Sequence, residues 1–229
     1  MTDLLTQGLR QLDFLPDEIL RIEPLMEKYI NELVLFNSAY NLVNTDSHDE
    51  LVINHILDSL SAWSQIKKIA SELQAEYGLQ KKVIIGDIGS GGGLPGIPLA
   101  ASLPELDFVL VERMSKRCAF LENVSAVLGL KNVTVKNIEA ERVERESVDV
   151  AVFRAFRPLD KKMIKTLLNI ISQNGVLAAY KAKLEKIKEE MSGINYTEEM
   201  YKIIPLEVPF LTDKDRTESR ERNLVLIKK

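Results

Sequence analysis

Cysteine and histidine are scarce in this chain. Among its 229 residues there is one cysteine, Cys118, and there are two histidines, His48 and His55. A single cysteine excludes an internal disulfide and a cysteine-based zinc site, and two histidines disfavour a histidine-rich metal centre. We therefore expect no metal site, and chemistry that is carried by organic groups.

Long hydrophobic runs and an excess of positive charge are also missing. No apolar segment approaches the roughly 20 residues that span a bilayer, and the N-terminus lacks the basic-then-apolar pattern of a signal peptide. These absences predict a cytoplasmic protein without membrane association. The formal net charge of −4 does not by itself indicate nucleic-acid binding, although local basic clusters are present.

Two different patterns divide the chain. In residues 1–80, apolar side chains recur at helical spacing over 16–36 and again over 51–76. From Lys81 onward, short β-branched runs alternate with helical stretches, which is typical of a parallel sheet covered by helices on both faces. We predict an N-terminal helical cap over 1–80 and an α/β domain over 81–229, together forming one compact unit.

Seven strands are expected within the α/β part, and helices separate the first five. The predicted strands are 81–89, 107–111, 132–135, 148–156, 175–182, 201–208 and 223–228, and the predicted helices are 96–102, 115–128, 159–171 and 183–191. This βαβ order indicates ligand binding at the carboxyl ends of the strands.

A glycine-rich turn, DIGSGGGLPG at 87–96, directly follows the first predicted strand. Glycine lets the backbone turn sharply and approach a ligand closely, and free N–H groups at the following helix terminus bind polar groups. Glu112 ends the second predicted strand, 23 residues after Gly89. A carboxylate there accepts hydrogen bonds from ribose hydroxyls; the alternative interpretation is a solvated acid beside Arg113.

The turn alone fits either a nicotinamide dinucleotide or S-adenosylmethionine. Three features favour the latter. The chain has no room for a separate dehydrogenase substrate domain, Pro95 and Pro98 leave little regular helix for a pyrophosphate, and 138–141 lies where class I methyltransferases hold adenine. On local sequence, 138–141 fits an ordinary acidic loop equally well.

Several short strings, spread over most of the chain, together resemble a known family. They are Tyr40-Asn41-Leu42, HILDS at 55–59, GSGGGLPGIP at 89–98, Lys116-Arg117, Arg154-Ala155-Phe156 and RNLVLIK at 222–228. The combination resembles the glucose-inhibited division protein B family, the bacterial small-subunit ribosomal RNA guanine-N7 methyltransferases. The resemblance implies a class I methyltransferase (Rossmann-like) fold, a mostly parallel seven-stranded sheet with an antiparallel edge, S-adenosyl-L-methionine as cofactor and 16S ribosomal RNA as substrate.

The resemblance also implies roles for individual residues. It places Arg154 in catalysis, and it places at the cofactor Gly89, Gly91, Leu94, Glu112, Ala140, Glu141 and Arg154. We expect RNA contacts from Asn41, His55, Lys116, Arg117, Lys181, Lys183 and Arg222. A purely structural role in the cap remains open for His55, and Asp58 could equally position His55 or cap a backbone group. For each lysine, a solvated surface position is the alternative.

Two positions depart from the family. Asn54 and Glu139 stand where members usually carry arginine, and fewer positive charges weaken the grip on phosphate. Methylation of a small molecule or protein, and a non-catalytic nucleotide-binding regulatory role, therefore remain alternatives.

The implied reaction also makes demands on the site and on the substrate. Guanine N7 is already nucleophilic, so positioning and local charge would dominate catalysis. The target base should be unstacked, in an assembled or partly assembled small subunit, and the protein is expected to act as a monomer.

Overall fold

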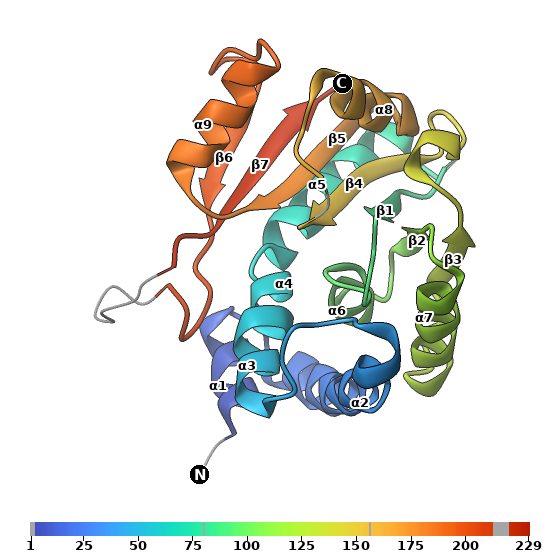
Figure 1. The fold of residues 1–229 in the computed structure, drawn as a ribbon, viewed down its shortest axis with the longest axis vertical. Helices are drawn as coiled ribbons and strands as arrows, with labels where there is room; N and C mark the ends of the chain where they lie inside the picture. Colours follow the sequence, from blue (N-terminus) through green and yellow to red (C-terminus); the bar gives the residue numbers. More distant parts are fainter. Residues whose placement is uncertain (1–2, 80, 156, 213–219) are drawn as a thin grey trace.

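In the residues that the computed structural model describes, which are 3–79, 81–155, 157–212 and 220–229, seven strands form one sheet (Figure 1). Phe156 of the Arg154-Ala155-Phe156 string lies outside these residues. The order across the sheet is β3-β2-β1-β4-β5-β7-β6. The strands are β1 (Ile84–Ile88), β2 (Asp107–Glu112), β3 (Val133–Asn137), β4 (Val148–Arg154), β5 (Ile171–Lys181), β6 (Lys202–Pro205) and β7 (Asn223–Lys228).

The direction of the strands confirms the predicted class I methyltransferase fold. Strands β1 to β5 pair in parallel, whereas β7 runs antiparallel to both β5 and β6. The chain reverses its direction of travel across the sheet between β1 and β4, which is the switch point where open α/β sheets bind ligands. The ends of these two strands are therefore the first place to look for a site.

Several strand boundaries differ from the prediction, and two of the differences have a clear physical cause. Strand β5 begins at Ile171, because the helix before it ends where the carbonyl oxygens of Asn169 and Ile170 accept hydrogen bonds from the N–H groups of Glu146 and Ser147. Strand β6 stops at Pro205, which has no N–H to donate to a ladder.

The N-terminal helices are α1 (Leu4–Gln11), α2 (Pro16–Tyr40), α3 (His48–Leu51), a π-helical segment (Val52–Leu57), α4 (Asp58–Leu60) and α5 (Trp63–Tyr77). The prediction of one helical stretch from 51 to 76 was wrong in its continuity. The chain turns at 61–62, where the Ser61 hydroxyl donates a hydrogen bond to the Asp58 carbonyl oxygen and competes with regular helix.

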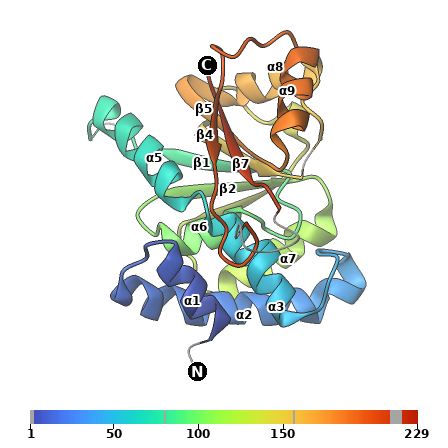
Figure 2. The same ribbon diagram turned by 90° about the vertical axis from the view of Figure 1, so that its left-hand side faces the viewer.

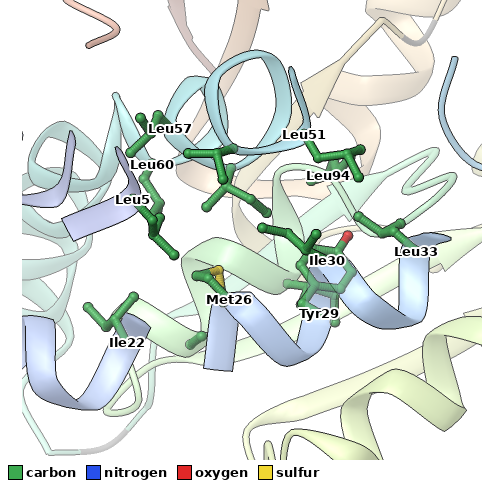
Figure 3. Packing of buried hydrophobic residues seen from close by; sticks show 14 of the residues in the cluster. Leu5, Ile22, Met26, Tyr29, Ile30, Leu33, Leu51, Leu57, Leu60 and Leu94 are labelled. Carbon is green, nitrogen blue, oxygen red and sulfur yellow. The ribbon is translucent and has the colours of Figure 1, made fainter. Parts of the chain in front are cut away.

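Apolar side chains join α1 to α4 to the glycine-rich turn (Figure 3). Met26 and Ile30 of α2 face Leu57 and Leu60, and Leu94 of the turn packs into the same cluster. Each of these side chains is buried, and burial of such a side chain stabilises the fold by about 1.5–3 kcal/mol. The turn is therefore anchored to the helices beneath it.

Helices cover both faces of the sheet (Figure 2). Helix α5 and α6 (Gly96–Ser102) pack on one face, and α8 (Lys161–Ile170) and α9 (Leu184–Gly193) pack on the other. Helix α7 (Ser115–Val127) packs against α2 and β3. Helix α5 belongs to the predicted cap over 1–80 but shares a core with the sheet of the predicted domain over 81–229. The boundary between the two at residue 80 therefore stays a prediction. Within the described ranges, none of the helices combines the length and apolar character needed to cross a bilayer.

Candidate functional site

The glycine-rich turn leaves β1 in a conformation that favours glycine. Gly89 and Gly91 have φ angles of 75° and 59°, in the left-handed region where a side chain is strained. The N–H groups of Gly89 and Ser90 both donate hydrogen bonds to the Val111 carbonyl oxygen of β2. The turn is thereby held over the carboxyl ends of β1 and β2.

Glu112 closes this turn from the neighbouring strand. Its Oε2 accepts a hydrogen bond from the Gly91 N–H at 3.0 Å, and its Oε1 accepts one from the Met114 N–H at 2.8 Å. Only 5% of the residue is exposed. Each carboxylate oxygen keeps a further lone pair, so Glu112 is fixed in place and still able to accept two hydroxyl groups.

A pocket of about 230 Å³, the Glu112 pocket, lies beside this carboxylate. Its lining is Gly89, Val111, Glu112, Arg113, Met114, Arg117, Ile138, Glu139, Ala140, Ala155 and Arg157. It brings together Gly89, Glu112 and Ala140, which were predicted from separate parts of the chain. The Glu112 carboxylate fits a ribose, and the apolar walls at Ile138 and Ala140 fit an adenine. The residues present are therefore compatible with S-adenosylmethionine.

Three other predicted cofactor residues do not line the Glu112 pocket. Gly91 contributes its N–H to Glu112, and Leu94 is buried in the core under the turn. Glu141 accepts a hydrogen bond from the Arg157 guanidinium at 2.9 Å. Its pKa is lowered, mainly by a backbone hydrogen bond and further by the charge of Arg157.

Arg154, the last residue of β4, is held by the segment that carries HILDS. Its Nη1 donates hydrogen bonds to the Asn54 carbonyl oxygen at 3.0 Å and to Asp58 Oδ2 at 2.8 Å. Its Nη2 donates to His55 Nδ1 at 3.1 Å. The other oxygen of Asp58 accepts from Arg222 Nε at 3.1 Å. One buried carboxylate thus holds two guanidinium groups, from β4 and from the residue before β7.

His55 is a neutral acceptor in this cluster. A guanidinium group only donates, so Nδ1 of His55 must be unprotonated and the imidazole proton lies on Nε2. Burial, together with the charge of Arg154, lowers the pKa of His55 to about 4. His55 Nε2 is buried and has no hydrogen-bond partner within the part of the chain that is described. The imidazole therefore orients Arg154 and carries no charge at neutral pH.

A second pocket, the Arg154 pocket, has a volume of about 680 Å³. Its lining is Asn44, Glu50, Asn54, His55, Asp58, Arg154, Ala155, Tyr180, Lys181, Ala182, Arg220 and Arg222. Ala155, with φ of 48°, lines this pocket and the Glu112 pocket alike. Groups bound in the two pockets would therefore meet beside Arg154, at the end of β4.

The predicted RNA residues do not all gather in the Arg154 pocket. His55, Lys181 and Arg222 line it, whereas Lys183 does not. Arg117 lines the Glu112 pocket, where its Nη2 donates to the Asn41 carbonyl oxygen at 3.0 Å.

Three further residues stand apart or depart from the family. Lys116 is exposed and lines neither pocket. Of the two departures, Asn54 lines the Arg154 pocket and Glu139 lines the Glu112 pocket.

Asp87 was missed as a site residue, and Asp58 was expected only to position His55 or to cap a backbone group. Asp58 holds both arginines, and Asp87 of β1 is buried with Oδ2 accepting a hydrogen bond from the Gly96 N–H at 2.9 Å. Burial raises the pKa of Asp87 to about 7. The signal was present, because each acid stands alone in an apolar stretch, IIGDI or HILDSL.

Comparison with known proteins gives one consistent match. The family described as rRNA small subunit methyltransferase G matches residues 22–224. Proteins named ribosomal RNA small subunit methyltransferase G are similar along the chain. The one from Treponema denticola is 39% identical and covers 99% of this chain and 94% of its own length. The one from Treponema pallidum subsp. pallidum is 38% identical and covers 82% of this chain and 79% of its own length. The one from Francisella tularensis subsp. tularensis is 32% identical and covers 100% of this chain and 98% of its own length.

Proposed function

The chain belongs to the rRNA small subunit methyltransferase G family, and from this premise we propose that it transfers the methyl group of S-adenosylmethionine to N7 of a guanine in small-subunit ribosomal RNA. The observation that carries the proposal is the junction at Ala155. A pocket suited to an adenosine meets a larger, arginine-lined pocket at the switch point of the sheet. Transfer between two bound groups needs such a meeting point.

On the cofactor side, Glu112 supplies acceptors for two ribose hydroxyls, and the walls of Ile138 and Ala140 take the adenine. When bound, the cofactor supplies an activated methyl group. The glycine turn keeps side-chain bulk away from it and lets the backbone approach closely, since Gly89 and Gly91 carry no side chains at positive φ.

On the substrate side, Arg154 acts as a fixed donor. Both N–H groups of Nη1 and one of Nη2 are used by Asn54, His55 and Asp58. The Nε–H and the second N–H of Nη2 have no acceptor among the described residues, and Arg154 lines the larger pocket, so these groups are left to donate to an acceptor of the substrate. Guanine presents O6 next to N7. Donation to O6 orients the base and leaves the N7 lone pair free to attack.

No proton has to be removed from guanine N7, so the reaction needs no general base. This agrees with a neutral His55, which burial and, to a smaller extent, the charge of Arg154 keep unprotonated at Nδ1. Catalysis then rests on orientation and on fixed charge in a partly water-excluded site. Asp58 and Arg222 contribute by holding Arg154 and by adding positive charge near the RNA backbone.

The substrate is proposed to be an assembled or partly assembled small subunit, acted on in the cytoplasm by a monomer. An acidic protein with a net charge of −4 gains little from unspecific attraction to RNA. Shape and presentation of the target guanine must then supply affinity.

Transfer of labelled methyl groups tests this proposal. Small subunits from cells that lack the protein are incubated with the purified protein and labelled S-adenosylmethionine. We expect label in ribosomal RNA, recovered as N7-methylguanine, and no label when subunits from wild-type cells are used. Absence of label in RNA, or label on another atom, would refute it.

A further inference from the structure

A third pocket, the α9 pocket, lies next to the two that the reaction uses. It has a volume of about 840 Å³. Its lining is Ala155, Arg157, Pro158, Lys181, Ala182, Lys183, Lys186, Ile187, Glu189 and Glu190. Ala155 lines all three pockets, and Lys181 with Ala182 forms a wall shared with the Arg154 pocket. The α9 pocket is therefore a continuation of the substrate site.

The chemistry of the α9 pocket has two parts. Apolar surface comes from Ala155, Pro158 and Ala182, with the buried Ile187 beneath them. Around it stand the basic side chains Arg157, Lys181, Lys183 and Lys186 and the acidic side chains Glu189 and Glu190. Lys181 pairs with Glu190 at 2.8 Å, and Arg157 pairs with Glu141, outside the lining, at 2.9 Å, so the cations offered to a ligand are mainly Lys183 and Lys186. Apolar surface that contacts a base, beside cations that contact its phosphate, is the combination by which proteins hold single-stranded RNA.

Neither the cofactor nor the target base needs this space. In the proposed function, the adenosine occupies the Glu112 pocket and the guanine occupies the Arg154 pocket. The RNA chain has to continue from the guanine in both directions, and the α9 pocket opens directly across the wall of Lys181 and Ala182. Its charge also suits phosphate, whereas the whole protein is acidic.

We propose that the α9 pocket binds the nucleotide adjacent to the target guanine, with its base against the apolar surface and its phosphate at Lys183 and Lys186. The inference rests on the proposed function. Lys183 makes no ion pair in the part of the chain that the structure resolves, and Lys186 pairs only with the exposed Glu189 at 2.7 Å. Both ammonium groups are therefore available to an incoming phosphate at little cost.

Helix α9 offers a matched test. Lys186 and Glu189 form an exposed ion pair that lines the pocket, whereas Lys188 and Glu198 form an exposed ion pair that does not. Substitution of either pair changes the net charge equally. A general electrostatic effect should therefore change KM equally for substitutions in both pairs, whereas a local contact should change KM only for substitutions of Lys186 and Glu189.

The experiment measures methyl transfer to small subunits from cells that lack the protein, over a range of salt concentrations. At 0.15 M salt, loss of one phosphate contact in Lys186→Glu should raise KM by about fourfold or more, and the salt exponent of kcat/KM should fall by about 0.7. Glu189→Gln should lower KM. The value of kcat should stay within about twofold in both, because neither residue lines the junction. Lys188→Glu and Glu198→Gln should match the wild type.

Equal effects of the two pairs, or unchanged KM in both pocket variants, would overturn the inference while leaving the proposed function intact. A wild-type protein that methylates no RNA would instead overturn the proposed function, and the inference with it.

Discussion

The ion-pair network of Asp58 gives the sharpest stability prediction. Asp58 is 4% exposed, and its carboxylate accepts hydrogen bonds from Arg154 and Arg222 through different oxygens. Removal of one partner of a buried pair leaves an uncompensated charge and typically costs about 3–5 kcal/mol. The arginine side chains are 14% and 20% exposed, and asparagine keeps one acceptor. We therefore expect Asp58→Asn to cost about 3 kcal/mol.

A double-mutant cycle separates this network from a loss of packing. Arg154→Gln alone should cost about 2 kcal/mol, since Asp58 retains Arg222. The double variant Asp58→Asn with Arg154→Gln should cost about 2 kcal/mol less than the sum, because the Arg154 charge that Asp58→Asn alone leaves unpaired is then absent, and only Arg222 still lacks its carboxylate.

Urea unfolding followed by circular dichroism measures all four proteins at neutral pH. The exposed pair Lys188 and Glu198 is the control, with a coupling of about 0.5 kcal/mol or less. Additivity of Asp58→Asn and Arg154→Gln within about 0.5 kcal/mol would refute the claim that one carboxylate organises this site.

Three further predictions follow from single residues. The folded pKa of His55 is about 4, below its unfolded value of about 6.5, so its contribution to stability is present above the unfolded pKa and is lost as the pH falls toward 4. About 2 kcal/mol of the free energy of unfolding should disappear between pH 7.5 and pH 5. In urea unfolding at both pH values, His55→Gln should abolish this pH-dependent part, and an unchanged pH dependence would count against the argument. Gly96→Ala would place a Cβ 2.4 Å from Leu110 Cδ2 and should cost about 1–3 kcal/mol of stability in thermal unfolding. Gly193→Ala, whose Cβ would have nothing within 4 Å, should be neutral, and equal melting temperatures of the two variants would contradict this. Glu112→Gln should weaken S-adenosylmethionine binding by about 1.5–3 kcal/mol in calorimetry with the fold intact, and unaltered affinity would remove Glu112 from the cofactor site.

Local patterns in the sequence were enough to predict the sheet and the glycine turn. The β-branched runs place the strands, and DIGSGGGLPG with Glu112 places the cofactor side, because these residues act through neighbours close in the chain or at the ends of adjacent strands. The antiparallel edge and the RNA substrate came from family resemblance, since no local pattern encodes them.

The Arg154 cluster could not be predicted in the same way. Asp58 lies 96 residues from Arg154 and 164 from Arg222 in the chain, and only the folded cap brings them together. The packing of Leu94 in the core was likewise not predicted, because a leucine at a ligand and a leucine that anchors a turn to the core give the same local pattern; its contact with the cofactor stays a prediction. The break at 61–62 coincides with a hydrogen bond from the Ser61 hydroxyl to the Asp58 carbonyl oxygen, which helical periodicity does not detect.

The most direct test of the central claim is a map of N7-methylguanine in ribosomal RNA from cells that have or lack the gene. The account predicts that one guanine of the small-subunit RNA loses its N7-methyl group in the deletion strain and regains it on complementation with the wild-type gene, but not with a Glu112→Gln gene. An identical pattern of N7-methylguanine in the presence and absence of the gene would contradict it.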